Sequence, residues 1–292
     1  MRPERDYEPL PLDPRLERAV HWLRDRVPGG GVGLMALERE TTAGGTLIAG
    51  GLAYRLFLWL LPFSLVVAAI ASFWELEDPE GLESSAKEFG LTASAARSMR
   101  QVIEDSARGR WYFLIIGLWF LMWFAIGVVR ALRVAHTVAW RSPRRRFRRP
   151  VHAGLLFTLF ATALIAVSGG SQWLREQAGV GGLVVTLLLV AVYAAGALWA
   201  MRLLPHGDAP WTALIPGAIL VGIGIQALHL FAALYLVPRL GRSSELYGSL
   251  GAATVILLWL YIIARLITLS AFLNATLWER RTADQSRLAS RA

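Results

Sequence analysis

The sequence contains no cysteine, and lysine occurs only once, at Lys87. Without cysteine there is no disulfide framework, no thiol nucleophile and no thiolate metal site. Only 17% of the 292 residues are charged, whereas about 25% is usual in soluble globular chains. Because 55% of the residues are hydrophobic and the mean hydropathy is +0.47, the composition indicates a membrane protein and not a soluble enzyme.

Acidic residues are also absent from six long apolar blocks, since all 21 Asp and Glu lie outside them. A helix needs about 20 apolar residues to cross a hydrocarbon core of about 30 Å, so each block predicts one transmembrane helix. The blocks do not alternate as the strands of a membrane barrel do. The predicted fold class is therefore all-α, a polytopic membrane protein with six spans at about residues 46–74, 111–129, 151–167, 180–201, 214–237 and 248–277.

The polar segments outside the blocks predict the domain organisation. Residues 46–278 form one membrane domain, preceded by a cytoplasmic segment over residues 1–45 and followed by a cytoplasmic tail over residues 279–292. An amphipathic helix is expected after Asp13, either on the membrane surface or packed on the ends of the spans. The polar segment between the first two spans predicts a small helical cap, because structureless loops of about 30 residues are uncommon.

Arginine is concentrated between the second and third spans, where residues 130–150 hold eight Arg and no acid. Positive charge in short loops indicates the cytoplasmic side, so an even number of spans predicts that both termini are cytoplasmic. Contact with anionic lipid is predicted for this run. Nucleic-acid binding would need interleaved aromatics, and only Trp140 and Phe147 are nearby, so no nucleic-acid partner is expected. The predicted lipid-contact residues are Arg141, Arg144, Arg145, Arg146, Arg148 and Arg149.

Catalytic patterns are missing. The sequence has no phosphate-binding GxxxxGK[ST] loop and no HExxH zinc motif, and its five histidines are scattered. No catalytic residue, metal site or cofactor is therefore predicted, and the chain is not expected to be an enzyme.

Two arginines, Arg55 and Arg265, lie inside the predicted spans. A charge at bilayer depth costs about 3 kcal/mol on insertion scales and usually has a partner. No predicted span contains an acid, so the partners considered are backbone carbonyls, aromatic faces, water, lipid phosphate or an anionic solute. Both residues are therefore candidates for an anion or lipid-headgroup site, with satisfaction by carbonyls, rings and water as the alternative.

The fifth span combines glycines with polar residues. Gly222 and Gly224 permit either close helix packing or local unwinding. Gln226 and His229 are three residues apart and share a helix face. They are candidates for lining a polar path, and interhelical hydrogen bonding is the structural alternative.

Two strings, GGLAYRLFLWLLPFSL and LYGSLGAATVILLWLYIIARLITLSAFLNATLWER, resemble blocks of the BrkB/YihY family of bacterial inner-membrane proteins. The resemblance covers about residues 37–279 and implies six helices in the cytoplasmic membrane, with an activity that is not settled. The family has carried ribonuclease and virulence labels and is often assumed to transport something; the residues do not support a ribonuclease. The shared positions are Tyr54, Pro62, Tyr247, Gly248, Gly251, Trp259, Tyr261, Asn274 and Ala275.

Two positions depart from the family pattern. Arg55 stands where the family has a second tyrosine, and Phe272 replaces the glutamate of a GAELNA-like string. The loss of that acid puts in doubt any mechanism in which it carries protons.

The predicted function is a transporter or lipid-handling protein of the bacterial cytoplasmic membrane with an anionic ligand. The alternative is a non-transporting scaffold or assembly factor that docks partners on the arginine-rich loop and the outer cap. A membrane enzyme acting on lipid would need a base at headgroup depth, for which only His136, His152 and His206 qualify. Membrane lipids are the expected partners, and small residues in the spans permit a homo-oligomer.

Overall fold

The computed structural model describes residues 30–73, 110–143, 147–178, 182–231 and 237–290. All regular elements in these ranges are helical, which confirms the predicted all-α class. Six helices are long and apolar enough to cross a membrane: α3 (Gly45–Phe73), α6 (Arg110–Ala139), α7 (Pro150–Ala178), α8 (Gly182–Leu203), α9 (Ile215–Phe231) and α10 (Val237–Ala289). Helix α2 (Gly30–Thr42) and the short 3-10 helix η2 (Trp211–Leu214) are the other elements of the described chain.

Several helices extend beyond the apolar blocks that predicted them. α6 continues to Ala139, ten residues past the expected end at residue 129, and α10 begins at Val237 and continues to Ala289. Apolar composition marks the part of a helix that lies in lipid, whereas the intrahelical hydrogen bonds continue wherever the backbone permits. Much of the predicted arginine loop is therefore helical, including Arg130 and Arg133.

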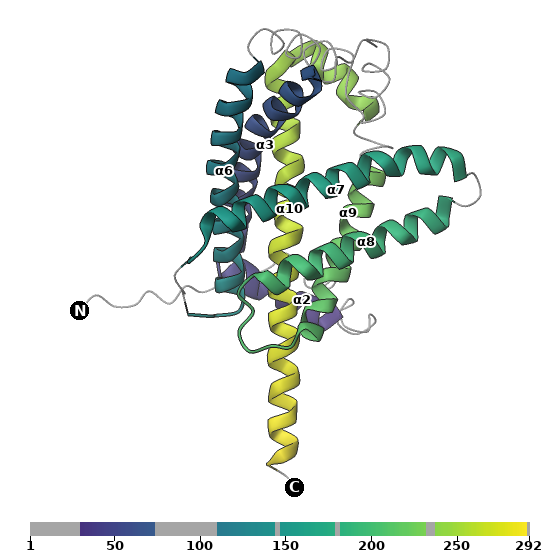
Figure 1. The fold of residues 1–292 in the computed structure, drawn as a ribbon. Helices are drawn as coiled ribbons and strands as arrows, with labels where there is room; N and C mark the ends of the chain where they lie inside the picture. The colour runs from purple at the N-terminus through teal and green to yellow at the C-terminus, as the bar shows by residue number, and fades with distance from the viewer. Residues whose placement is uncertain (1–29, 74–109, 144–146, 179–181, 232–236, 291–292) are drawn as a thin grey trace.

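Both ends of the described chain lie at the same end of the bundle. Figure 1 shows α2 and the C-terminal part of α10 in its lower half, together with the loop from α6 to α7. We call this the basic end. Its position on the cytoplasmic side stays a prediction, and the predicted amphipathic helix and polar cap lie outside the described residues.

A glycine separates α2 from the first span. Gly44 has a φ of +72°, a left-handed conformation that glycine adopts without a steric penalty. The N–H groups of Ala43 and Gly44 donate to the carbonyls of Arg39 and Thr41 at 3.0 and 3.1 Å, which closes α2. The chain then enters α3 in a new direction, so that α2 packs against α10.

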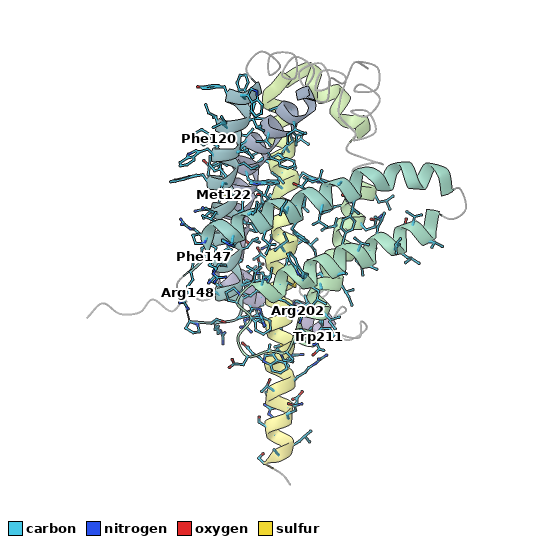
Figure 2. All side chains as sticks on the ribbon, in the orientation of Figure 1. Phe120, Met122, Phe147, Arg148, Arg202 and Trp211 are labelled. Atoms are coloured by element: carbon cyan, nitrogen blue, oxygen red, sulfur yellow. The ribbon has the colours of Figure 1, made fainter. Side chains whose placement is uncertain are left out.

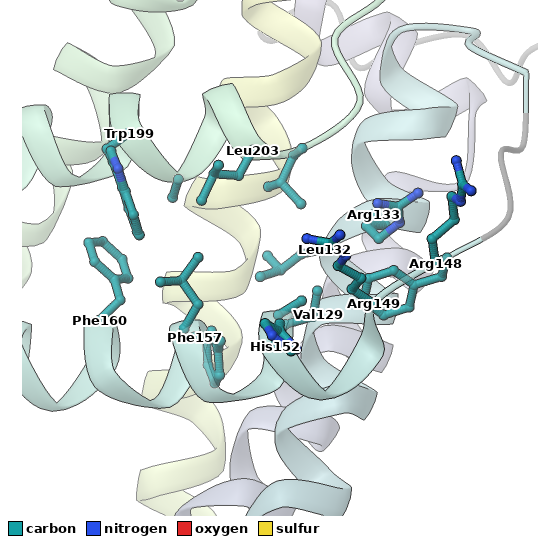
Figure 3. A pocket seen from close by; sticks show the side chains of 15 residues that line it. Val129, Leu132, Arg133, Arg148, Arg149, His152, Phe157, Phe160, Trp199 and Leu203 are labelled. Atoms are coloured by element: carbon teal, nitrogen blue, oxygen red, sulfur yellow. The ribbon is translucent and has the colours of Figure 1, made fainter.

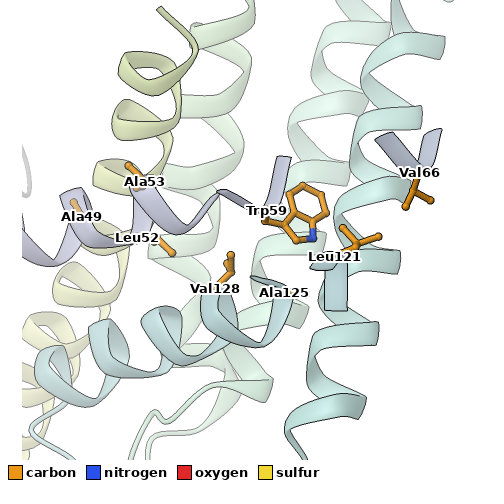
Figure 4. Close-up of a cluster of buried hydrophobic side chains, with 9 residues drawn as sticks. Ala49, Leu52, Ala53, Trp59, Val66, Leu121, Ala125 and Val128 are labelled. Atoms are coloured by element: carbon orange, nitrogen blue, oxygen red, sulfur yellow. The ribbon is translucent and has the colours of Figure 1, made fainter. Parts of the chain in front are cut away.

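Alanines and larger apolar residues together form the contact between α3, α6 and α10. Figure 4 shows this cluster, which includes Ala49, Ala53, Ala125 and Ala264. Because lipid tails are as apolar as leucine, helices in a membrane associate through close packing, which small residues permit. The larger Trp59 lies in the same cluster and stacks on Phe63, with 4.7 Å between ring centroids.

The outer surface of the bundle is apolar, as lipid contact requires. Figure 2 shows side chains of α6 projecting away from the bundle, Phe120 among them. The large aromatic residues exposed along this helix are Trp111, Tyr112, Trp119, Phe120 and Trp123.

Helices α7 and α8 form a peripheral pair. They cross α6 and α10 at a steep inclination in Figure 1. Only 6% of the apolar stretch of α7 is buried within the protein, compared with 33% for α3. Fewer protein contacts hold α7 than hold α3, and this difference bears on the site below.

Candidate anion-binding site

Arg265 has a carboxylate partner. Its guanidinium donates through Nη1 to Oε1 of Glu40 in α2, 225 residues earlier in the chain. The Glu40 side chain is 0% exposed and that of Arg265 is 27% exposed. The expectation that no acid pairs with Arg265 is therefore wrong, because the acid comes from the segment before the first span and not from a span.

The neighbouring residue of α2 makes a second ion pair with α10. Arg39 donates to both carboxylate oxygens of Glu279, at 2.6 and 2.8 Å. It also donates to the carbonyl of Ala139 at the C-terminal end of α6, at 2.7 Å. Since the last carbonyls of a helix lack intrahelical partners, this arginine both caps α6 and joins it to α10.

Arg55 makes one hydrogen bond to the backbone of a neighbouring helix. Its Nη1 donates to the carbonyl of Gly127 in α6 at 3.3 Å, one of the partners expected from the sequence. The pairing of Arg265 with an acid and of Arg55 with a carbonyl weakens the argument that these residues require an anion. Their role as ligand residues stays a prediction.

Asn274 joins the start of α9 to α10. Its Oδ1 accepts from the N–H of Gly217 at 2.7 Å, and its Nδ2 donates to the carbonyl of Leu214 at 3.1 Å. Gly217 leaves the space for this contact, since a Cβ there would lie 2.6 Å from the carbonyl oxygen of Ser270. Gly217 and Asn274 thus form one contact, although 57 residues separate them along the chain.

The other family-motif residues lie on α3 and α10. Tyr54 is exposed on α3, and Pro62 lies inside that helix. The remaining positions of the motif lie along α10: Tyr247, Gly248, Gly251, Trp259 and Tyr261. Phe272, the departure from the family pattern, is fully buried against Ala139 and Ala271.

One of the two polar residues of the fifth span, His229, lies beside a polar residue of α8. The ring of His229 lies 5.7 Å from that of Tyr193 in α8, centroid to centroid. The Tyr193 hydroxyl forms a hydrogen bond with Ser168 in α7 at 2.8 Å. α9 is unbroken through Gly222, where a Cβ would lie 2.7 Å from the carbonyl oxygen of Val190, so this glycine serves packing and not unwinding.

A cavity of about 1010 Å³ lies between α6, α7 and α8 near the basic end. Basic groups lie at one end of it and aromatic groups at the other, as Figure 3 shows. No acidic residue is among its lining residues. The basic lining residues are Arg133, Arg148, Arg149 and His152, and the larger apolar ones include Leu156, Phe157, Phe160, Trp199 and Leu203.

The part of the cavity that is lined by arginines suits a phosphate or carboxylate group. Arg148, Arg149 and His152 are exposed, and the guanidinium carbon of Arg133 lies 4.7 Å from the ring centroid of Phe147. Guanidinium groups bind such anions through paired hydrogen bonds. At the other end, the rings of Phe160 and Trp199 lie 5.4 Å apart and offer an apolar wall.

Sequence reasoning found part of this cavity. Arg148 and Arg149 belong to the predicted lipid-contact run and do line it. Arg141 lies elsewhere, beside α2 and Glu279, and its φ of +46° ends α6. Arg144, Arg145 and Arg146 are outside the described residues. The aromatic wall was missed, because apolar residues in a span carry no sign of whether they face lipid, a neighbouring helix or a cavity.

The histidines give no metal site in the part of the chain that the structure describes, where no group of three potential metal ligands occurs. His136 is buried, with Nδ1 3.0 Å from the carbonyl oxygen of Leu132. His206 has Nδ1 2.8 Å from the carbonyl oxygen of Leu204.

These features define a class: an α-helical membrane protein with six candidate spans and a basic, partly apolar cavity near one end of the bundle. The family model described as virulence factor BrkB matches residues 36–292, so the chain belongs to the BrkB family. The resemblance inferred from the sequence is confirmed.

Three relatives match the chain at low identity. The UPF0761 membrane protein Nmul_A0452 of Nitrosospira multiformis is 26% identical over 80% of this chain and 57% of its own length. The ribonuclease-like protein YfkH of Bacillus subtilis is 23% identical over 84% of this chain and 94% of its own length. The UPF0761 membrane protein Smlt0865 of Stenotrophomonas maltophilia is 23% identical over 78% of this chain and 56% of its own length. The chain thus spans little more than half of the two UPF0761 relatives, and no solved structure matches it.

Proposed function

We propose that this protein binds an anionic phospholipid in the cavity between α6, α7 and α8 and handles that lipid in the bacterial cytoplasmic membrane. The observation that carries the proposal is the lining of this cavity. The lining combines three arginines and a histidine with an aromatic wall, and it contains no acidic residue. Such a cavity matches an amphipathic anion, with its phosphate at the arginines and an acyl chain along the rings. No chemical step on the lipid is part of the proposal.

A lipid is favoured over a soluble anion by the surroundings of the cavity. α7 exposes Leu155, Leu156 and Leu159 beside it, and Leu156 also lines it. A ligand held there therefore has an apolar surface to follow into the bilayer. At about 1010 Å³ the cavity is at the upper end of the usual range for ligand pockets, about 300–1,000 Å³. This volume suits a headgroup with part of a chain.

The first test compares lipid retention in the parent and in an Arg148→Gln/Arg149→Gln variant by native mass spectrometry. We expect the variant to hold phosphatidylglycerol at least about tenfold more weakly, equivalent to about 1.4 kcal/mol. Phosphatidylcholine, which has no net charge, is expected to bind weakly to both proteins. Added inorganic phosphate at millimolar concentration separates the two anion sources, because a site for free phosphate would release the lipid whereas a lipid site would retain it.

The matched control is Arg281→Gln/Arg287→Gln, which removes the same charge from exposed positions of α10. This control is expected to bind phosphatidylglycerol like the parent. Equal lipid retention in the parent and the Arg148/Arg149 variant would contradict the proposal.

We also propose that the basic end faces the cytoplasm, because the arginine-rich residues 130–150 lie there. A reporter fused after Ala292 is expected to be active only in its cytoplasmic form. An exported phenotype for this fusion would reverse the orientation.

The alternative function is a scaffold, and the projecting end of α10 favours it. Residues 279–289 of this helix are exposed. Figure 1 shows this part of α10 extending beyond the bundle. A scaffold would hold a protein partner in mild detergent and show the same unselective lipids in the parent and the Arg148/Arg149 variant.

A further inference from the structure

A second cavity, of about 440 Å³, lies between α2, α10 and the residues that follow α6. Its volume falls within the usual range for ligand pockets, about 300–1,000 Å³. The first cavity has no acid among its lining residues, whereas this one is lined by charges of both signs, and the two cavities share no lining residue. The charged residues of the second cavity are Glu38, Arg39, Arg141, Glu279 and Arg280.

Three of these five charges have no partner of opposite charge among the described residues, because the other two pair with each other. The Arg280 guanidinium donates to the sulfur of Met35, which carries no charge. The side chains of Glu38 and Arg141 are exposed and take part in no ion pair within the described ranges. Two positive charges and one negative charge therefore remain available at this cavity.

The lining also contains a buried hydroxyl group. Thr276 on α10 is 4% exposed, and its Oγ1 makes no hydrogen bond to any described residue. Buried polar atoms are nearly always hydrogen-bonded, so an exception calls for a specific reason such as a ligand. A hydroxyl in the wall of a cavity can donate to a phosphate oxygen.

Arg141 has a backbone conformation that arginine rarely adopts. Its φ of +46° lies in the left-handed region, where glycine is the usual residue because it has no Cβ. Glycine would end α6 at this position without that steric penalty. Strained backbone of this kind is concentrated at binding sites. This observation is independent of the charges and concerns the same residue.

The cavity lies at the level where α10 changes from apolar to charged residues. The apolar stretch of this helix continues to Trp278, and charged residues begin at Glu279. In a membrane-spanning helix this change, marked here by a tryptophan, indicates the depth of the lipid headgroups. Met35 lines the cavity and is 40% exposed, which adds an apolar surface beside the charged groups. A lipid headgroup is therefore favoured over a soluble ligand.

We propose that this second cavity binds a zwitterionic headgroup in which a phosphodiester lies beside a primary ammonium group, as in phosphatidylethanolamine. Arg141, Arg280 and Thr276 bind the phosphate. Glu38 accepts hydrogen bonds from the ammonium group, whose three N–H donors match a carboxylate. The proposal does not depend on the anionic lipid at the first cavity, because different residues form the two sites.

The first test measures headgroup selection by native mass spectrometry with equal amounts of phosphatidylethanolamine and phosphatidylcholine. The choline group has no N–H donor, so we expect the parent to hold phosphatidylethanolamine at least about tenfold more tightly. Glu38→Gln is expected to remove this preference. Asp284→Asn is the matched control, because it removes an acid from an exposed position of α10 outside the cavity. It is expected to keep the preference of the parent.

The second test removes the Arg141 side chain without straining the backbone. Arg141→Gly places glycine where φ is +46°, so the variant is expected to fold like the parent. Its retention of phosphatidylethanolamine should fall at least about tenfold, because a charge-assisted hydrogen bond to phosphate is lost. Its retention of phosphatidylglycerol at the first cavity should be unchanged. Arg281→Gln, at an exposed position outside the cavity, is the control and is expected to hold both lipids like the parent.

The outcomes separate the two lipid sites. Unchanged phosphatidylethanolamine retention in Glu38→Gln or in Arg141→Gly would overturn the zwitterion site and leave the proposed function standing. Loss of phosphatidylethanolamine in Arg141→Gly, together with unchanged phosphatidylglycerol retention in Arg148→Gln/Arg149→Gln, would support the zwitterion site and overturn the proposed function. Release of phosphatidylethanolamine by millimolar glycerophosphoethanolamine would support the same headgroup chemistry and overturn a membrane lipid as its source.

Discussion

Glu40→Gln is expected to lower the free energy of unfolding by about 3 kcal/mol, the largest effect of any single charge removal among the described residues. Loss of one partner of a buried ion pair costs about 3–5 kcal/mol, because the remaining charge is left uncompensated. The lower end of this range applies, because the Arg265 side chain is 27% exposed and its charge is therefore only partly buried. The glutamine is nearly isosteric, so the change reports the charge and not a cavity.

The measurement is unfolding of the purified protein in mixed micelles with increasing denaturing detergent, followed by circular dichroism. Glu38→Gln is the matched control, because Glu38 lies on the same helix and is exposed. Its effect is expected to be below about 0.5 kcal/mol. Adding Arg265→Gln to Glu40→Gln should recover part of the loss, since the double variant leaves no unpaired charge. An equal effect of Glu38→Gln and Glu40→Gln would show that the pair does not contribute to stability.

Asn274→Leu is expected to cost about 2–5 kcal/mol, because it removes two hydrogen bonds between the asparagine amide and buried backbone groups. The groups are the N–H of Gly217 and the carbonyl of Leu214, both of which now bond to the asparagine side chain. The N–H of Gly217 lies in the first turn of α9, where N–H groups lack intrahelical acceptors, and water is scarce within a membrane bundle. The same detergent titration measures the loss.

Gln226→Leu is the control for this second prediction. It also replaces a buried amide by leucine, but Oε1 of Gln226 has no hydrogen-bond partner among the described residues. A loss below about 1 kcal/mol is expected for it. A loss equal to that of Asn274→Leu would mean that general polarity at these positions, and not the two backbone bonds, sets the stability.

The Glu40–Arg265 ion pair and the Asn274 hydrogen bonds both attach other parts of the bundle to α10. Arg39 and Glu40 attach α2 to α10 through adjacent ion pairs, and Asn274 attaches the start of α9 to the same helix. α10 is thus the common support of the bundle. By contrast, α7 is attached weakly and lies against the cavity.

The sequence alone predicted a helical membrane protein, because the features that indicate a transmembrane helix lie within one continuous segment of the chain. An uncharged apolar block long enough to cross the core forms a helix, since every backbone group must be satisfied within its own segment. The BrkB resemblance was equally local, because it lies in continuous strings around Tyr54 and Asn274. Helix ends were less predictable, as in α6, because the intrahelical bonds that continue to Ala139 do not depend on apolarity.

Only the tertiary structure decided which residues meet. The acid that pairs with Arg265 lies 225 residues away, in a segment whose own sequence is that of an ordinary charged helix. The aromatic wall formed by Phe160 and Trp199 likewise depends on how α7 and α8 cross, which leaves a cavity where other spans pack closely. Helix formation is set by neighbours along the chain, whereas the partners of a side chain in a bundle are set by helix packing. For this reason the sequence by itself determined a six-span membrane protein with a basic segment between its second and third spans, and the fold placed the candidate site.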